Sequence, residues 1–228
     1  YGDSCLMQLY LIIVLISMQG CMEFKDILQV SCLFFINKLL YDREKPYNEG
    51  QQYINERKQI NMEFWDIYDK DKKPTGRTMK RNDWCLKDGE YHLTVLGVVA
   101  RPDGTFLITK RVMTKAWAPG WWEVSGGAAQ AGEESYEAVL REVKEETGLD
   151  ARGAEGGYLF TYKRENPGEG DNYFVDVYRF VMDIDEKNLH LQTEETDGYM
   201  FATVDEIKAF AAEGKFLHYD SIKKAFEL

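Results

Sequence analysis

The sequence is poor in the residues that build disulfide frameworks and zinc sites. It has four cysteines and three histidines in 228 residues, and no two cysteines form a CxxC pair or stand at zinc-site spacing. The cysteines are Cys5, Cys21, Cys32 and Cys85. A small secreted domain held by disulfides does not fit this pattern, so we expect a reducing, cytoplasmic setting.

Basic residues are also scarce relative to acidic ones. The chain carries 28 Lys and Arg against 39 Asp and Glu, a formal net charge of −11. A surface that binds nucleic-acid backbone needs clustered Lys and Arg, so we expect no nucleic-acid partner. An anionic small molecule still fits, because a divalent cation can invert the local field in an acidic pocket.

A long hydrophobic run is missing near the start of the chain. The apolar stretch over residues 9–16 is shorter than the roughly 20 residues that a membrane-spanning helix needs. It follows Asp3 and no Lys or Arg, which is unlike a secretory signal. We therefore expect no membrane association.

Residues 1–61 differ in character from the rest, and we treat 62–228 as the main domain. The periodicity predicts an amphipathic helix over 22–40, and a polar linker follows it. Two interpretations stay open: a native helical extension, or an over-extended reading frame with translation starting at Met62 or Met22. A purine-rich run resembling a bacterial ribosome-binding site can encode Glu56-Arg57-Lys58, upstream of Met62.

In the main domain, runs rich in β-branched and aromatic residues alternate with helical patterns. Strands are predicted over residues 64–68, 75–79, 91–100, 105–111, 158–162 and 173–182, and helices over 133–147, 204–213 and 220–228. The first two strands flank a turn-forming segment and predict a hairpin. Strands with helices at intervals predict α/β layers around a sheet.

Three carboxylates share one face of the helix predicted over 133–147. Glu142, Glu145 and Glu146 stand at i, i+3 and i+4. Like charges at this spacing destabilise a helix, and hard oxygen donors at this density suit Mg²⁺ or Mn²⁺. Without its surroundings, the same pattern would be interpreted as a solvated acidic face.

The surroundings of these glutamates are more specific. The chain reads Gly127, five residues, Glu133, seven residues, Arg141-Glu142-Val143, one residue, Glu145-Glu146, one residue, Gly148-Leu149. This run resembles the Nudix box at every fixed position. Upstream, Trp122 and Gly126-Gly127 resemble the W-x-x-x-G-G segment that commonly precedes the box in this family, with Ser125 where a proline is usual.

The resemblance implies the Nudix fold, a mixed sheet sandwiched between helices. It implies that Glu142, Glu145 and Glu146 bind Mg²⁺ or Mn²⁺, and that Glu133 and Arg141 form a salt bridge that positions the helix. It assigns backbone roles to Gly127, where the loop turns, and to Gly148, where the helix ends.

The reaction that the resemblance implies is attack of water on a phosphorus atom of a diphosphate, with a carboxylate taking the proton. In this family the base lies either in the box or in a later loop. Glu142 is the candidate in the box. In the later loop we favour Glu195 over its neighbour Glu194.

A narrower resemblance, to type 1 isopentenyl-diphosphate isomerases and related Nudix hydrolases, covers residues 62 to 215. It rests on Trp65-Asp66, Asp69, Pro74-Thr75-Gly76, Tyr91-His92-Leu93 and Pro119-Gly120-Trp121-Trp122. The isomerase needs a cysteine and a histidine after the tryptophan, and residues 123–128 contain neither. We therefore expect a hydrolase, with the isomerase as runner-up and a non-catalytic Nudix ligand-binding module as a third possibility.

The box does not determine the substrate. We expect a small-molecule diphosphate linked to a nucleoside or an isoprenoid-like alcohol. Substrate contacts are predicted for Arg111, Lys115, Trp121 and Lys163, because basic and aromatic side chains can meet phosphate or stack on a ring. The sequence carries no indication of oligomeric state.

Overall fold

The computed structural model describes residues 63–166 and 168–227. The expectations for residues 1–61, including the helix over 22–40 and the two start sites, lie outside this part of the chain. No helix within the described residues is long and apolar enough to cross a membrane.

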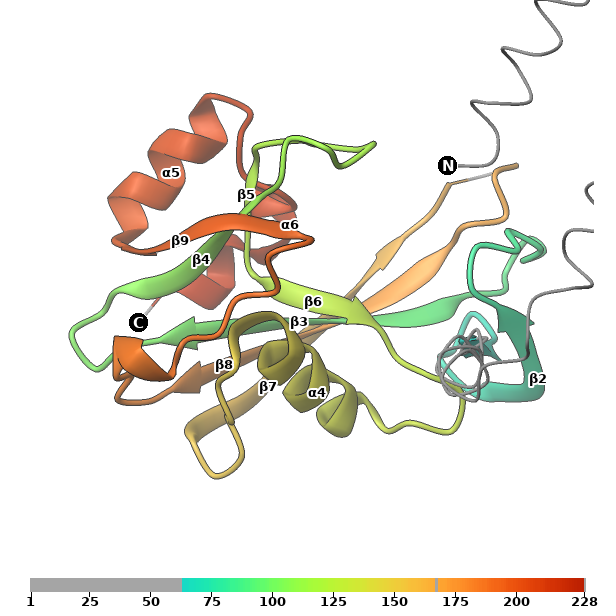
Figure 1. Ribbon diagram of the computed structural model, residues 1–228. Helices are drawn as coiled ribbons and strands as arrows, with labels where there is room; N and C mark the ends of the chain where they lie inside the picture. The colour runs from blue at the N-terminus through green and yellow to red at the C-terminus, as the bar shows by residue number, and fades with distance from the viewer. Residues whose placement is uncertain (1–62, 167, 228) are drawn as a thin grey trace, which may run out of the picture. The chain divides into compact units, whose positions relative to one another are not determined.

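A mixed seven-stranded sheet forms the centre of the main domain (Figure 1). Its strands run in the order β5-β4-β3-β8-β7, while β6 pairs with β3 and β9 pairs with β4. The bounds are β3 His92–Ala100, β4 Phe106–Arg111, β5 Trp122–Glu123, β6 Ser125–Ala128, β7 Glu155–Arg164, β8 Tyr173–Val181 and β9 Thr196–Ala202. The parallel pairing of β3 with β8 sets His92 beside Tyr173.

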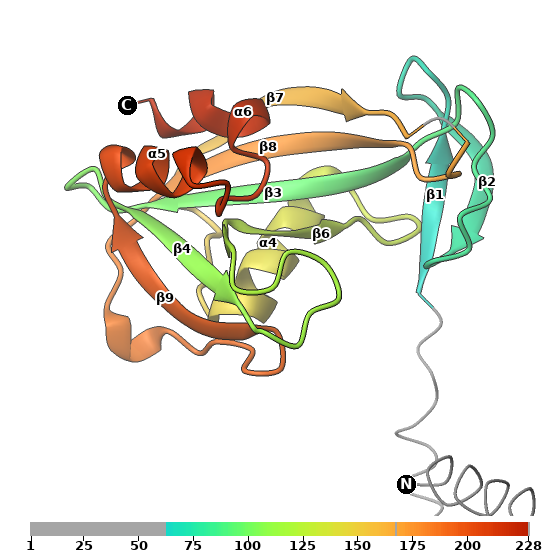
Figure 2. The same cartoon turned by 90° about the horizontal axis from the view of Figure 1, so that it is seen from above.

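Both faces of the sheet are buried, which explains the nearly continuous apolar sequence of β3. Val95 and Val99 face α4 (Ser135–Thr147), whereas Leu96 and Val98 belong to the core beneath the C-terminal helices. Those helices are α5 (Val204–Ala212), α6 (Tyr219–Ile222) and the 3-10 turn η2 (Lys223–Phe226). Figure 2 shows α4 and the pair α5 and α6 on opposite faces of the sheet.

A two-stranded hairpin, β1 (Phe64–Tyr68) and β2 (Pro74–Lys80), lies at one end of the sheet (Figure 2). It has a small core of its own, built from Trp65, Ile67, Met79 and Leu86. The Nζ atom of Lys72 bonds to the buried carboxylate of Asp176 on β8 and fastens the hairpin turn to the sheet.

The predicted α/β class, the hairpin, the strand over 91–100 and its antiparallel partner are confirmed. Three elements depart from the predicted ranges by two residues or more. The main helix begins at Ser135, because Glu134 is still extended at its N-cap. Strand β7 begins at Glu155 and includes Gly156 and Gly157. Two adjacent glycines suggest a loop in the sequence, and both adopt positive φ values within the strand. The last predicted helix is divided into α6 and η2.

Candidate active site

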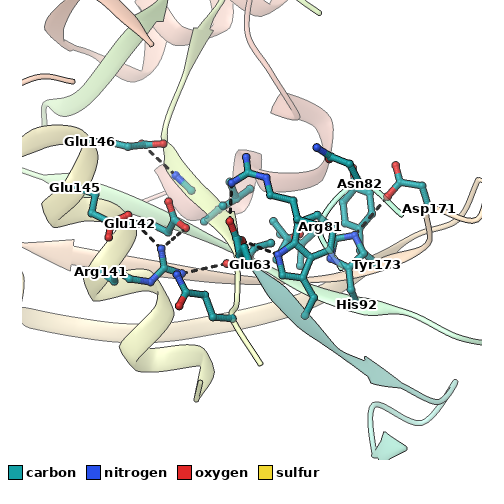
Figure 3. Close-up of a pocket in the computed structure, with 18 of the residues that line it drawn as sticks. Glu63, Arg81, Asn82, His92, Arg141, Glu142, Glu145, Glu146, Asp171 and Tyr173 are labelled. Carbon is teal, nitrogen blue, oxygen red and sulfur yellow. Dashed lines mark hydrogen bonds and ion pairs between the residues drawn. The ribbon is translucent and has the colours of Figure 1, made fainter. Parts of the chain in front are cut away.

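Helix α4 presents its carboxylates beside β6. Val139 and Val143 are fully buried against the sheet, which fixes the rotation of the helix about its axis. The helix stops at Gly148, which adopts a left-handed conformation with φ 78° and donates its N–H to the Lys144 carbonyl at 2.9 Å. The three box glutamates therefore occupy the last two turns, at one side of the pocket in Figure 3.

Two consecutive glycines on β6 let these carboxylates approach the strand. A Cβ atom on Gly127 would lie 2.6 Å from Oε2 of Glu142, a distance that only a shift of the glutamate could relieve. The N–H of Gly126 donates to Oε2 of Glu146 at 3.3 Å. A side chain at Gly127 would thus displace the carboxylate that the resemblance makes a metal ligand.

Arg141 organises the acidic side of the pocket. Its guanidinium donates to both oxygens of Glu133 at 2.8 and 2.9 Å and to the Ala128 carbonyl at 3.1 Å. It also contacts Glu142 at 2.7 Å and Glu145 at 3.2 Å. The arginine therefore both anchors the helix and neutralises part of the charge beside it.

The negative charge of the box carboxylates is only partly compensated by Arg141. Burial raises the pKa of Glu142 against the opposing effect of Arg141, and Glu145 and Glu63 raise it further. Burial also raises the pKa of Glu146 well above its usual range, and the carboxylates of Glu123 and Glu142 add to the rise. Hydrogen bonds from Ser125 and Gly126 offset only part of this effect. A cation at this position would stabilise both ionised carboxylates.

The donor chemistry fits a hard divalent cation. The three box side chains offer only carboxylate oxygens, which Mg²⁺ and Mn²⁺ prefer. Within the described residues Glu146 makes no ion pair with a basic side chain, so no neighbouring cationic side chain offsets its negative charge. In the same part of the chain, no three His, Cys, Asp or Glu side chains converge into a ready-made ligand set. Binding would therefore require the glutamates to move toward one another.

The pocket beside these carboxylates has a volume of about 380 Å³. Figure 3 shows the glutamates of α4 on one side and Asn82, His92, Asp171 and Tyr173 on the other, with Glu63 and Arg81 between them. Trp65, Trp84, Tyr162, Gln192, Glu195 and His218 also line it.

Of the two candidate bases in the late loop, the structure brings only Glu195 to the pocket. Glu195 directly precedes β9 and forms an ion pair with Lys115, whose Nζ lies 3.0 Å from Oε2. Glu194 is exposed and is not among the residues that line the pocket. Glu142 also lines the pocket, and its carboxylate accepts a hydrogen bond from Arg141.

The predicted substrate-binding residues are scattered. Arg111 pairs with Glu123 at 2.8 Å and lines a smaller adjoining cavity of about 170 Å³. Lys115 reaches the main pocket only through Glu195. Trp121 lines neither cavity, and its carbonyl accepts a hydrogen bond from the N–H of Arg111 at 2.9 Å.

Lys163 lies away from the pocket because side chains alternate along β7. Its neighbour Tyr162 lines the pocket, whereas the Nζ atom of Lys163 donates to the Lys70 carbonyl at 2.6 Å and sits over the ring of Tyr91. The prediction from loop composition assumed that strand β7 ended before Lys163, but β7 continues to Arg164.

Sequence reasoning gave no role to much of the rest of the pocket lining. Glu63 precedes the hairpin, Arg81, Asn82 and Trp84 follow it, Asp171 precedes β8, Tyr173 begins β8, and His218 belongs to the C-terminal segment. They stand far apart in the chain and share no motif. Only the Trp65-Asp66 and Tyr91-His92-Leu93 segments of the isomerase resemblance pointed to this part of the pocket.

Comparison with known proteins identifies the family. The family model described as NUDIX domain matches residues 90–223. The chain belongs to the Nudix family. It is 34% identical over 168 residues to an uncharacterized Nudix hydrolase of Listeria innocua, covering 73% of this chain and 95% of that one. It is therefore an enzyme of the Nudix hydrolase type, whose members act on diphosphates.

Two further similarities bear on fold and on the narrower resemblance. The crystal structure of DR0079 from Deinococcus radiodurans shares the fold, with a TM-score of 0.54 and 22% identity over 67% of this chain and 91% of that one. An isopentenyl-diphosphate Delta-isomerase of Kocuria rhizophila is 30% identical over 122 residues, covering 52% of this chain and 67% of that protein. This weaker similarity is consistent with the narrower resemblance to isopentenyl-diphosphate isomerases.

Proposed function

We propose that this Nudix enzyme is a Mg²⁺- or Mn²⁺-dependent hydrolase that cleaves the diphosphate linkage of a nucleoside-diphosphate-linked or similar organic diphosphate. The observation that supports this most directly is Glu146. Its carboxylate is largely withdrawn from water next to Glu123 and Glu142, and its pKa is raised well above the usual range. A divalent cation would supply the positive charge that such a site lacks, and would allow an anionic diphosphate to bind beside the carboxylates.

In this proposal Glu142, Glu145 and Glu146 hold the cation. A cation held there would supply polarisation of a phosphate oxygen and neutralisation of the charge that develops during displacement. Glu195 takes the proton from the attacking water, since it lines the pocket and is kept in place by Lys115. Glu142 is the alternative base, but its hydrogen bond with Arg141 at 2.7 Å favours a ligand role.

The isomerase is disfavoured by the composition of the pocket. Cys85 is exposed, is the one free cysteine in the described part of the chain, and lines a separate cavity. No cysteine lines the main pocket, so the residue that an isomerase would use is missing there. A non-catalytic module is disfavoured because all three box glutamates are present. A cytoplasmic location stays a prediction from the small number of cysteines.

Phosphorus NMR would test the proposal. Purified protein with Mg²⁺ is incubated with nucleoside di- and triphosphates, ADP-ribose, dinucleotide polyphosphates and isopentenyl and dimethylallyl diphosphates. We expect cleavage of at least one diphosphate, reduced about 100-fold or more in Glu145→Gln, because loss of a metal ligand costs more than loss of a supporting contact. Glu137→Gln, an exposed residue of α4, is the matched control and should behave as wild type.

Two results would contradict the proposal. One is interconversion of the two isoprenoid diphosphates without phosphate release, which would establish the isomerase. The other is cleavage that Glu145→Gln leaves unchanged, which would show that the box glutamates do not carry the reaction.

A further inference from the structure

Strand β7 is an open edge of the main sheet. It runs for ten residues, Glu155–Arg164, at the end of the strand order, and within the described residues it pairs only with β8. Figure 2 shows it outermost, beyond β8 and β3. We propose that this edge is the interface of a symmetric dimer, in which β7 pairs antiparallel with β7 of a second copy of the chain.

The edge has little of the protection that natural sheets use against such pairing. Unpaired N–H and C=O groups along an edge strand are a template for another strand, which proteins usually block with short strands, proline, lysine or a bulge. Strand β7 is long and contains no proline. The Nζ atom of its one lysine, Lys163, donates to the Lys70 carbonyl at 2.6 Å and lies over the ring of Tyr91. This ammonium is therefore held against the hairpin turn and does not extend along the open edge.

A bulge lies at the middle of the strand. Tyr158 and Phe160 each have a partner on β8, whereas Leu159 between them has none. The bulge divides β7 into two segments of equal length, residues 155–158 and 161–164. In an antiparallel pair centred between Leu159 and Phe160, each segment of one copy would lie along the other segment of the second copy. Two equivalent ladders would then flank the bulge.

This register also keeps side chains on matching faces of the sheet. Residues directly opposite each other in an antiparallel pair point to the same face. The register sets Tyr158 opposite Thr161 of the second copy, and within one chain their side-chain oxygens lie 2.8 Å apart. Thr161 also contacts Asp176, which accepts a hydrogen bond from Ser135 of α4. Both side chains therefore lie on the face that α4 covers, as the pairing requires.

Exposed apolar side chains gather beside the same edge. Tyr158 is 55% exposed, Leu159 is 37% exposed, and Tyr136 of α4 is 40% exposed. The rings of Tyr136 and Tyr158 both contact Tyr178, with centroids 6.1 and 5.7 Å away. These side chains thus form one patch, and contiguous apolar patches mark interaction surfaces, where tyrosine is enriched. A two-fold axis at the middle of β7 would bring the patches of the two copies together.

The charges at the ends of β7 select a second copy as the partner. Glu155 begins the strand and Arg164 ends it, and in the described part of the chain neither forms an ion pair. The two-fold pairing sets Glu155 of each copy opposite Arg164 of the other, which supplies two ion pairs. A surface that complements itself in this way is what a two-fold dimer needs, whereas a strand of another protein would match it only by coincidence.

Sedimentation of the full chain over a concentration series tests the dimer. Wild type should show an equilibrium between monomer and dimer. Leu159→Arg should raise the dissociation constant about 10-fold or more, because it places two like charges at the centre of the interface. Met113→Arg is the matched control, since Met113 is 69% exposed in the loop after β4, and it should associate as wild type does.

Exchange of the end charges tests the register. Glu155→Arg and Arg164→Glu should each weaken self-association about 10-fold or more, since each sets like charges opposite one another. Mixed in equal amounts, the two variants should associate about as tightly as wild type, because the mixed dimer again pairs opposite charges at both ends. Recovery on mixing would also show that both variants are folded.

Three results would overturn the interface. One is a wild-type protein that stays monomeric throughout the concentration series. Another is a dimer that Leu159→Arg and Met113→Arg leave equally tight, which would lie on a different surface. The third is a failure of the two charge variants to recombine while each keeps the wild-type circular dichroism, which would show that Glu155 and Arg164 do not meet across a two-fold axis.

Discussion

Arg141 holds Glu133 with two parallel hydrogen bonds, from Nε to Oε1 at 2.8 Å and from an NH₂ group to Oε2 at 2.9 Å. The same guanidinium reaches the Ala128 carbonyl on β6 and the Glu142 carboxylate. One side chain thus connects the loop before α4, the helix itself and the neighbouring strand. The position of the box carboxylates depends on this fork.

Arg141→Lys should destabilise the fold because an ammonium keeps the charge but cannot reproduce the bidentate contact. Hydrogen bonds to charged groups contribute about 1.5–3 kcal/mol each, so we expect a loss on the order of 1–3 kcal/mol in the free energy of unfolding. Urea denaturation measures it. Arg152→Lys, whose pair with Glu137 is exposed, serves as the control and should change little. Equal midpoints for the two variants would refute a structural role for the fork.

Glu195→Gln should reduce kcat by about 10²- to 10⁴-fold with little change in KM, because it removes the proposed proton acceptor but keeps the shape of the side chain. Glu194→Gln is the neighbouring control and should retain wild-type activity, since Glu194 does not line the pocket. Steady-state kinetics on whichever diphosphate the enzyme cleaves would decide. If Glu195→Gln retained full kcat, the role of base would pass to Glu142.

His218 should make the protein less stable in acid. Burial and then the charges of Arg164 and Arg111 lower its pKa to about 4, from an ordinary value of 6.5. Between these two values the unfolded chain binds a proton that the folded chain does not, so the free energy of unfolding rises with pH from about 4 to 6.5. Above that range His218 contributes no further pH dependence.

The variant His218→Asn isolates this effect, since asparagine tolerates the left-handed backbone with φ 58°. Urea denaturation at pH 4.5 and pH 7 should show a smaller difference between the two pH values for the variant than for wild type. Identical pH dependence in both proteins would show that His218 is not held in its neutral form.

The parts of the fold that the sequence predicts are those governed by local periodicity. The apolar, β-branched run over residues 91–100 predicted a buried strand, and the Nudix box predicted α4 and its end at Gly148. Strands β6 and the start of β7 were missed because Gly126-Gly127 and Gly156-Gly157 suggest loops. Each pair lies in a strand that hydrogen-bonds to a long neighbour, β3 or β8, and this tertiary pairing overrides local preference.

The candidate site likewise has one side that the sequence predicts and one side that it does not. Its acidic side is contiguous in sequence, so the spacing of Glu142, Glu145 and Glu146 predicted that they share a face. Its aromatic side arises from long-range pairing: β3 aligned with β8 sets His92 beside Tyr173, and the segment after the hairpin brings Trp84 into the same pocket. No spacing in the sequence predicts that His92, Tyr173 and Trp84 lie in one pocket.

Gly97 tests how tightly α4 packs on the sheet. It lies on the face of β3 that packs against α4, where an added Cβ atom would sit 2.6 Å from a methyl of Val143 and 3.0 Å from one of Val139. Gly97→Ala should therefore cost about 1–3 kcal/mol, as overpacking of a core does, and should shift the helix that carries the box. The free energy of unfolding and the activity should fall together.

Gly198→Ala on β9 is the matched control, because nothing lies within 4 Å of its Cβ position. It makes the same chemical change in a strand but meets no neighbour, so thermal and urea unfolding should match wild type closely. If Gly97→Ala were as stable and active as Gly198→Ala, α4 could retreat from the sheet at no cost. The close approach of helix and strand would then not be what positions the glutamates.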